Sequence, residues 1–498
     1  MGLISGLALG LQTAVTLEAL VFCFLGVTTG MFIGVLPGIG PLAAVAMILP
    51  VTYHLEPTVA LIMLAGIFYG AQYGGSTASI LLNLPGTSTT AVTAIDGYPM
   101  AQQGRAGVAL FITTLSSFIG GCFAIVLLMS FAPALGTLAL KFSSAEYFSV
   151  MLLGLIAAAT MSLGNPIKGV ASVVAGLMLA MVGMDTTSGT LRYTFGILEL
   201  QDGLSLVAMA MGLFGVAEIL KNAGTPERDT SKLQSVRLRD LLPTRQDLGQ
   251  CWKPTLRGAT IGSFIGVLPG AGPTLAAFLA YAMEKRVARD PSRFGKGAIE
   301  GISAPEAANN ASTQAAFIPT LALGIPGDAG MAVLLGAMMI HGIQPHAEFF
   351  TLHAGLFWGL VVSFWIGNVM LLFLNIPLIG LWVRILTIPK RMLFPSVIFF
   401  ICVGVYSVNN NPFDVLMVII FGLVGYVMNA FQYPTAPLLM GFILGPMIEQ
   451  HFRRALLFSR GDYTTFVDRP ISAGFLAASA LLLIVMVLPV IKRWGRKG

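Results

Sequence analysis

Charged residues are scarce in this chain of 498 residues. They make up 10% of it, whereas soluble domains usually carry about 25%. Hydrophobic residues account for 56%. This composition excludes an ordinary soluble enzyme or binding domain and predicts a protein surrounded mainly by lipid.

Several motifs that carry chemistry are also missing. There is no nucleotide-binding loop of the form GxxxxGK[ST], no opposed pair of acids for an intramembrane protease, and no metal-ligand spacing among the five histidines. The cysteines are too far apart to indicate disulfides or a metal motif; they are Cys23, Cys122, Cys251 and Cys402. We therefore expect no catalysis and no bound cofactor. The net charge of +6 indicates topology rather than nucleic-acid binding. The lack of a basic segment before the first apolar run argues against a cleaved signal peptide.

Long uncharged stretches are what the sequence does contain. Each is long enough to cross a hydrocarbon core of about 30 Å as a helix. None alternates with the period of a membrane β-strand, so a barrel is disfavoured. We predict an all-α polytopic protein with about 10 to 12 transmembrane segments. The stretches are 19–55, 57–95, 106–140, 147–167, 258–283, 307–327, 349–383, 415–448 and 471–491.

An internal duplication divides the chain into two halves. Residues 30–41 (GMFIGVLPGIGP) return as residues 262–273 (GSFIGVLPGAGP) with ten of twelve positions identical, each 232 positions later. A second match relates 83–87 (NLPGT) to 324–328 (GIPGD), 241 positions later. We predict a first membrane repeat at 1–220, a cytoplasmic linker at 221–257, a second repeat at 258–470, and a C-terminal transmembrane helix with a basic cytoplasmic tail at 471–498.

The basic residues indicate how the halves are oriented. The linker carries eight Lys and Arg against four acids, and another basic cluster follows at 285–296. Both should be cytoplasmic, so residues 258–284 between them must enter the membrane and return as a re-entrant hairpin. The equivalent stretch 19–55 has no flanking Lys or Arg, as expected for a hairpin that opens on the other side. The halves should therefore form two inverted-topology repeats.

The repeated Pro-Gly breaks are the candidate binding site. Non-helical backbone inside a bilayer must be buried in protein or line a wet cavity, and the N-termini of half-helices attract carboxylates. A kink or a close-packing motif is the alternative, which the repetition in both halves disfavours. The substrate-binding candidates are Gly38, Ile39, Gly40, Ser76, Thr77, Thr87, Ser88, Gly270, Ala271 and Gly272. The helix-break candidates are Pro37, Pro41, Pro85, Gly86, Pro269, Pro273, Pro326 and Gly327.

A coupling ion needs ligands of a different kind. Asn side chains, carboxylates and free carbonyls suit Na⁺, and the candidates are Asn83, Asn309, Asn310 and Asp328. Asp328 lies in a long apolar region, where a charge costs about 2.5 to 3.5 kcal/mol at a helix centre. Its alternative role is a helix cap. Glu306 and Asp96 rank lower because they could cap helices at the membrane edge.

Four segments together resemble the TctA family, the large membrane subunit of the tripartite tricarboxylate transporters. They are 34–41 (GVLPGIGP), 69–86 (YGAQYGGSTASILLNLPG), 96–99 (DGYP) and 304–310 (APEAANN). The resemblance covers nearly the whole chain. It implies a permease that works with a small four-helix membrane subunit and a periplasmic binding protein. It also implies transport driven by an ion gradient, with Na⁺ or H⁺ as the coupling ion.

The expected function is therefore that of a permease subunit that imports small carboxylate anions across the bacterial inner membrane. Citrate, another di- or tricarboxylate, or an aromatic acid all remain candidates for the substrate. The alternative is a passive anion channel or a membrane scaffold that uses the same breaks only for packing.

Overall fold

The structure is a computed structural model that describes residues 2–36, 40–160, 165–185, 187–224, 238–270, 272–345 and 349–494. Its first half is helical apart from one small β-hairpin and a 3₁₀ turn, Leu198–Leu200. The helices are α1 (Leu3–Ala14), α2 (Leu17–Val35), α3 (Pro41–Thr52), α4 (Pro57–Leu82), α5 (Ala91–Gln102), α6 (Ala106–Ala139), α7 (Ser144–Thr160) and α8 (Pro166–Ala180). After the antiparallel strands β1 (Gly183–Met184) and β2 (Leu191–Arg192) come α9 (Leu206–Ala210), a π-helical stretch (Met211–Val216) and α10 (Ala217–Ala223).

The second half is also helical, with 3₁₀ turns at Leu238–Leu241 and Pro291–Arg293. Its helices near the break motifs are α11 (Arg245–Val267), α12 (Gly272–Val287), α13 (Glu300–Ala315), α14 (Phe317–Leu323), α15 (Ala329–Ile340), α16 (Phe349–Leu352) and α17 (Ala354–Asn375). The remaining helices are α18 (Ile379–Ile385), α19 (Lys390–Asn409), α20 (Pro412–Ala430), α21 (Thr435–Phe458), α22 (Thr465–Asp468) and α23 (Pro470–Trp494). The expected all-α class is confirmed.

Seven helices among the described residues are long and apolar enough to cross a membrane. They are Leu17–Val35, Pro57–Leu82, Ala106–Phe131, Leu206–Ala223, Ala354–Asn375, Arg391–Asn409 and Pro412–Ala430. Six shorter apolar helices, including α3, α7 and α15, accompany them. The total number of membrane passes therefore depends on how many pairs of shorter helices together cross the membrane. The predicted count of about 10 to 12 passes stays a prediction.

Matched glycine contacts confirm the duplication in three dimensions. A Cβ atom at Gly30 would lie 2.3 Å from the carbonyl oxygen of Ile67, and one at the equivalent Gly262 would lie 2.2 Å from that of Ala308. At such separations only glycine lets the two backbones approach. The full set pairs Gly26 with Met63, Gly30 with Ile67 and Gly34 with Ala71 in one half, and Gly258 with Ala304, Gly262 with Ala308 and Gly266 with Ser312 in the other. In each half, the first arm of the hairpin, α2 or α11, thus runs parallel to the helix that leads to the second Pro-Gly break, α4 or α13. We call α4 and α13 the broken helices.

Contacts between the halves show that they run in opposite directions. Helix α6 is parallel to α11, because Arg105 binds Asp247 and Ser116 binds Thr255. Helix α17 is parallel to α4. The contacts that establish this second direction are Gly359 with Thr58, Gly367 with Tyr69 and Asn368 with Tyr73.

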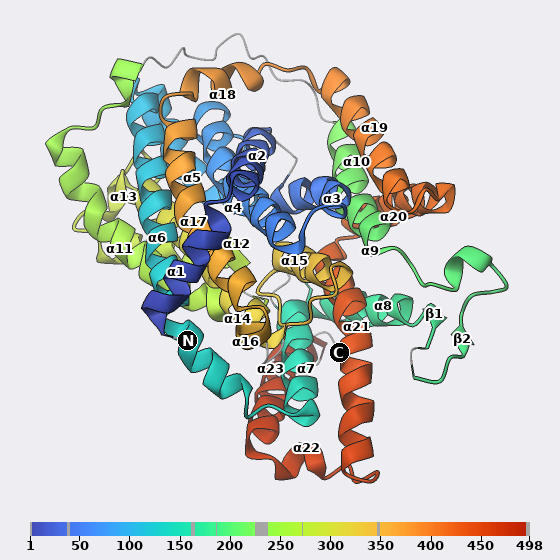
Figure 1. Cartoon of the computed structure of the whole chain (residues 1–498). Helices are drawn as coiled ribbons and strands as arrows, with labels where there is room; N and C mark the ends of the chain where they lie inside the picture. The colour runs from blue at the N-terminus through green and yellow to red at the C-terminus, as the bar shows by residue number, and fades with distance from the viewer. Residues whose placement is uncertain are drawn as a thin grey trace.

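The long helices α6 and α17 are antiparallel to each other. Gly121 of α6 meets Asn368 of α17, and Met129, further along α6, meets Trp365, which is earlier in α17. Helices α2 and α4 are therefore antiparallel to α11 and α13, as the inverted-repeat prediction requires. Each long helix packs on the broken helix of the other half, and α6, α11 and α13 lie together in Figure 1.

The hairpin predicted at 258–284 is present. Its arms α11 and α12 fold back on each other. Arg257 Nε of α11 donates over 2.5 Å to Glu284 Oε1, which is close to the end of α12. Helix α11 begins at Arg245, ahead of the expected boundary at 258, because Thr244 and Asp247 form a capping box. Both flanks of the hairpin thus lie on one side of the molecule, and their cytoplasmic location stays a prediction.

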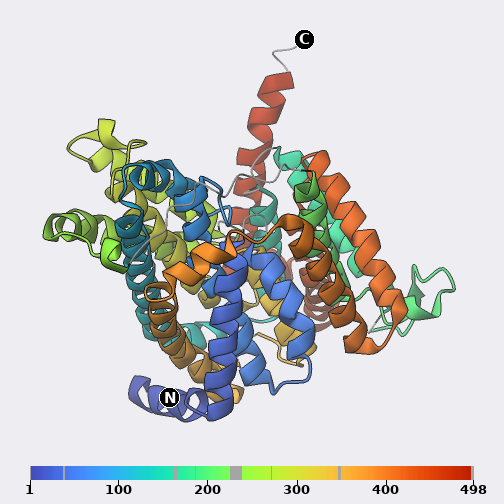
Figure 2. The ribbon, with the colours of Figure 1, turned by 90° about the horizontal axis from the view of Figure 1, so that it is seen from above.

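The last part of each half packs in a separate group. Helices α7 and α8 of the first half contact α21, and α7 also contacts α23. The hairpin β1–β2 projects from this group at the edge of the molecule (Figure 2). Arg192 of β2 connects it to α21 through Glu449 at 3.0 Å. This group also contacts the break motifs of the second half, because a Cβ atom at Gly270 would lie 2.7 Å from the Ala158 amide nitrogen of α7, and one at Gly324 would lie 3.4 Å from Met447 of α21.

Candidate functional site

Helix α4 ends where the sequence predicts its break. Its last helical residue is Leu82, and Asn83 follows in the left-handed conformation with φ 52°, which Asn tolerates better than most residues. In the second half α14 ends at Leu323, and Gly324 is also left-handed with φ 68°. The two residues are 241 positions apart, so the repeats end their broken helices in the same way.

Hydroxyl groups hold the first break, residues 83–90, against α4. Ser79 Oγ donates to Thr90 Oγ1 over 2.9 Å, and Thr90 Oγ1 in turn accepts from the Thr87 amide at 3.2 Å. Thr89 Oγ1 donates to Gln72 Oε1 at 2.9 Å and lies 2.7 Å from Thr87 Oγ1. This network gives the non-helical backbone the partners that it needs in a bilayer. Thr87 is buried in it, whereas Ser88 is exposed.

The second break, residues 324–328, ends in a capped helix. Asp328 is the N-cap of α15, and its Oδ1 accepts from the Met331 amide at 2.9 Å. The structural alternative considered for Asp328 is thus present, and a cap by itself does not test ion binding. Asn309 and Asn310 lie on α13, and no described contact joins either of them to Asp328. The predicted ion ligands are therefore divided between two places.

Each break lies against the hairpin of its own half. A Cβ atom at Gly86 would lie 2.6 Å from the Gly34 carbonyl oxygen, and one at the equivalent Gly327 would lie 3.2 Å from that of Gly266. A Cβ atom at Gly272 would lie 3.4 Å from Cβ of Asp328. The break of each half therefore packs against the end of the first hairpin arm, α2 or α11.

The hairpin tips are described in part. Pro41 is the first residue of α3, as predicted, and the N-cap Gly40 leaves this helix without a side-chain cap. In the second tip Gly270 and Gly272 have φ +76° and +64°, Pro269 lies in the break, and Pro273 is in the first turn of α12. The predicted residues Pro37, Gly38, Ile39 and Ala271 lie outside the described residues.

A hydrogen bond joins the first break to the second hairpin. Ser88 Oγ of the break lies 3.0 Å from Thr274 Oγ1 in the first turn of α12. Pro85 of the same break is exposed, whereas Pro326 of the second is buried. Of the other predicted residues, Ser76 and Thr77 are buried on α4 close to this break. The predicted residue Ser88 of the first half thus lies beside the helix that begins at the predicted residue Gly272 of the second half.

Glu306 is the most enclosed acid of the second half. Its side chain is 0% exposed on α13, where Thr93 Oγ1 of α5 donates to Oε1 at 2.5 Å and Ser117 Oγ of α6 donates to Oε2 at 3.2 Å. The sequence suggested that Glu306 caps a helix at the membrane edge. In the structure Glu306 does not have this role. Both hydroxyls belong to the other half of the molecule, so Glu306 lies at the junction of the repeats.

Asp96 has an anchoring role instead. Its Oδ1 accepts from the amides of Gly295, Gly297 and Ala298 at 2.8 to 2.9 Å, and its Oδ2 accepts from Tyr281 at 3.0 Å. The carboxylate of α5 thus fixes the loop between α12 and α13. These partners account for its burial without any ligand.

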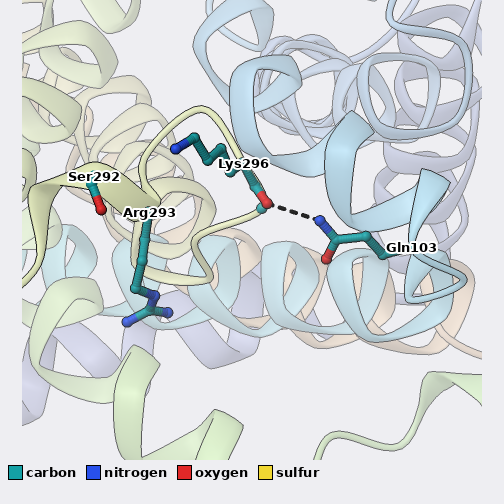
Figure 3. Close-up of a pocket in the computed structure, with 5 residues that line it drawn as sticks. Gln103, Ser292, Arg293 and Lys296 are labelled. Atoms are coloured by element: carbon teal, nitrogen blue, oxygen red, sulfur yellow. Dashed lines mark hydrogen bonds between the residues drawn. The ribbon is translucent and has the colours of Figure 1, made fainter.

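A pocket of about 310 Å³ lies beside this loop, apart from the breaks (Figure 3). Gln103 Nε2 donates to the Lys296 carbonyl oxygen over 2.9 Å at its edge. Its lining is Gln103, Ser292, Arg293, Lys296 and Gly297. Arg293 is paired with Glu300 at 3.1 Å, and Lys296 is the other basic residue of the lining.

Comparison with known proteins agrees with this geometry. A family model described as "Tripartite tricarboxylate transporter TctA family" matches residues 20–440. The chain belongs to the TctA family. The resemblance drawn from the break motifs is thereby confirmed, and membership makes this TctA protein a membrane component of a transporter that has other subunits.

Two relatives of this TctA protein come from Agrobacterium vitis. One, named "Uncharacterized 52.8 kDa protein in TAR-I ttuC' 3'region", is 48% identical over 492 residues, which are 99% of this chain and 98% of that protein. The other, "Uncharacterized protein in TAR-II ttuC' 3'region", is 51% identical over 231 residues, 46% of this chain and 96% of that protein. No solved structure matches the chain.

Sequence reasoning singled out the segment from Asn83 to Thr90, but it missed Gln72 and Thr274. Gln72 accepts from Thr89 of the first break, and Thr274 meets Ser88 across the repeats. Gln72 is an amide side chain within a long apolar stretch of the sequence. That unusual position was a signal that could have identified it. Thr274 carries no such signal, because a threonine after a Pro-Gly break is also an ordinary first-turn residue.

Proposed function

We propose that this TctA protein is the permease subunit of a binding-protein-dependent secondary transporter. It imports small di- or tricarboxylate anions across the bacterial inner membrane. A periplasmic binding protein delivers the anion, a small membrane subunit completes the complex, and an ion gradient supplies the energy. The proposal is supported most by the convergence of the two inverted halves at Ser88 and Thr274, 3.0 Å apart.

The anion site lies between the first break and the second hairpin tip. The first-turn amides of α3 have no side-chain cap, and a helix N-terminus carries about half a positive charge. Hydroxyls of Ser88 and Thr274 add donors for carboxylate oxygens. The described tip residues Gly40, Gly270 and Gly272 belong to the same site. With no Lys or Arg in either break, selectivity for anions comes from dipoles and from bound cations.

Transport follows from the inverted arrangement. Rocking of one repeat against the other exposes a central site to each side in turn. The basic flanks of the second hairpin place that side in the cytoplasm, so the first hairpin opens toward the periplasm. Because Ser88 and Thr274 come from opposite repeats, their separation changes during this motion.

A cross-link between those two residues tests the proposal. The Ser88→Cys/Thr274→Cys variant, reconstituted with the proteins encoded beside it, should lose at least about 90% of carboxylate uptake when oxidised and regain it on reduction. Each single variant is the matched control, because it contains the same native cysteines. Full uptake by the oxidised, fully cross-linked pair would reject alternating access at this junction.

The passive alternative has its own test. Proteoliposomes with an imposed Na⁺ or H⁺ gradient should accumulate the carboxylate above its external concentration, and accumulation should require the binding protein. A channel would only equilibrate the substrate, and a scaffold would transport none. Either of those outcomes would reject the secondary-transport proposal.

A further inference from the structure

A buried polar cluster surrounds Glu306 where five helices meet. Around it lie Thr93 of α5, Ser117 of α6 and Asn310 of α13 itself. One turn further along α6, Gly121 contacts Asn368 of α17, which accepts from Tyr73 of α4 at 3.0 Å. Carboxylate, hydroxyl and amide oxygens are the usual ligands of Na⁺, and a carboxylate also binds H⁺.

Glu306 has no basic partner. Among the described residues, no Lys, Arg or His lies within ion-pair distance of it, although nine such pairs occur elsewhere in the described chain. The hydroxyls of Thr93, Ser117 and Ser76 stabilise this buried carboxylate only in part, and an isolated buried charge still costs several kcal/mol. A cation is therefore needed to neutralise it.

Polar atoms next to Glu306 indicate where such a cation would be held. Asn310 Nδ2 donates to the Glu306 carbonyl oxygen at 3.1 Å, but Asn310 Oδ1 has no partner. Both polar side-chain atoms of Asn309 are also without partners, although this residue is only 1% exposed. Buried amides normally find hydrogen-bond partners. The unpaired amide oxygens of Asn309 and Asn310, about one turn from Glu306 along α13, point to an absent ligand.

Other ionisable groups on the surrounding helices are already engaged or neutral. Asp96 of α5 is held by three amides and Tyr281 of α12, and Arg257 of α11 is paired with Glu284 of α12. Tyr73 of α4 and Cys122 of α6 are the remaining titratable side chains nearby. None supplies a compensating positive charge.

We propose that Glu306 carries the coupling cation, H⁺ or Na⁺, at the junction of the two repeats. The inference rests on the proposed transport function and assigns its cation site. Thr93 and Ser117 belong to the first repeat and Glu306 to the second, so relative motion of the repeats opens or closes the site. The position equivalent to Glu306 in the first repeat is Ala65, which leaves one such site per chain.

The Glu306→Gln variant tests this assignment. Gln keeps the shape of Glu and can still accept one of the two hydroxyl hydrogen bonds through Oε1, whereas its Nε2 only donates, so the other hydroxyl has to turn and accept. Gln carries no charge for a cation to neutralise. In proteoliposomes, gradient-driven accumulation should fall to the equilibrium ratio of one, while exchange of labelled for unlabelled substrate continues. Varying pH and Na⁺ separately in the wild type identifies the cation. Gradient-driven accumulation by Glu306→Gln equal to wild type would overturn the proposal.

A second pair of variants covers the case in which Glu306→Gln fails to fold. Ser117→Ala removes one hydroxyl from Glu306, and Ser116→Ala removes the neighbouring hydroxyl that binds Thr255 at 3.1 Å. Ser117→Ala should raise the cation concentration for half-maximal uptake about three- to tenfold, as expected for one lost hydrogen bond. Ser116→Ala should leave it unchanged. Equal effects in both variants would overturn the proposal.

The competing acid provides the last comparison. Asp328→Asn keeps the α15 cap, because Asn is also a good N-cap. If it abolishes ion-driven accumulation while Glu306→Gln retains it, the cation site belongs at Asp328 and the proposal for Glu306 is wrong. A wild-type protein that neither accumulates nor exchanges any carboxylate would instead reject the transport function itself.

Discussion

The two repeats share a backbone design and differ in their chemistry. Gly30 and Gly262 allow the same close helix contact, and Asn83 and Gly324 end the broken helices in the same conformation. The polar residues do not follow this symmetry. Where the second repeat has Glu306, Asn310, Gln314 and Asp328, the first has Ala65, Tyr69, Tyr73 and Thr87.

This difference supports a proposed division of labour between the repeats. The first repeat contributes hydroxyls at its break and the uncapped N-terminus of α3 at its hairpin tip, which suit a carboxylate. The second contributes two acids and unpaired amides, which suit a cation. The packing glycines tolerate almost no change, because a larger side chain would meet the backbone of the neighbouring helix, whereas polar positions between the helices are free to diverge.

The largest expected effect would break the shared packing. Gly30→Ala and Gly262→Ala should both remove most of the folded protein from the membrane, since the added Cβ would lie 2.2 to 2.3 Å from a carbonyl oxygen and overpacking of this kind costs about 1 to 3 kcal/mol or more. Size-exclusion profiles of extracted protein would measure the loss. Gly249→Ala is the control, because nothing lies within 4 Å of its added Cβ. A severe loss for only one of the two equivalent glycines would contradict the packing symmetry.

The hairpin tips should respond unequally. Gly40→Val should abolish uptake and leave a stable protein, because an added Cβ there meets nothing within 4 Å. Gly270→Val should lower stability as well, because Gly270 has φ +76° and its Cβ would lie 2.7 Å from the Ala158 amide nitrogen. Uptake assays and thermal melts of both proteins would distinguish the two effects. Normal uptake by Gly40→Val would remove the first tip from the site.

The connection between the repeats at Asp96 should have an intermediate effect. Asp96→Asn weakens the charged hydrogen bonds to the loop between α12 and α13 and should lower the free energy of unfolding by about 1 to 3 kcal/mol. Asp290→Asn, in the same loop but exposed, should cause little change. Thermal melts in detergent would measure both variants. Equal melting temperatures for Asp96→Asn and wild type would contradict the anchoring role.

The smallest effect lies away from the break motifs, in the β-hairpin formed by β1 and β2. Hydrogen bonds from the Thr187 amide and the Ser188 hydroxyl, with nearby Arg453 and Arg192, lower the pKa of Asp185 to about 2. Because the pKa of Asp185 in the folded protein lies below the ordinary value of an aspartate, the contribution of ionised Asp185 to the stability of the hairpin is fully present above about pH 4. This contribution is lost as the pH falls toward 2.

A spin label can report this loss. A label attached at the exposed position of Phe195 (Phe195→Cys) should become more mobile between pH 4 and pH 2, because the pKa of Asp185 is lowered to about 2. The same label in an Asp185→Asn background should show a smaller change. Equal pH responses in the two backgrounds would exclude Asp185 as the titrating group.

The sequence predicted much of this fold for identifiable reasons. Pro41 begins α3, and the basic flanks at Arg257 and Lys285 predicted that α11 and α12 fold back on each other. Proline, glycine and clustered charge act locally, so their effects can be read along the chain. The start of α11 was missed, because the capping box of Thr244 and Asp247 begins the helix inside a stretch that resembles a polar linker.

The sequence alone determined the membrane class, the duplication and the positions of the four breaks, because each depends on composition or on residues adjacent in the chain. Only the tertiary structure decided which acid lies at the junction of the repeats. Asp328 follows a Pro-Gly motif and attracted attention, yet it caps α15. Glu306 is in an unbroken helix, and its enclosure by Thr93 and Ser117 arises because α5 and α6 of the opposite repeat pack against it.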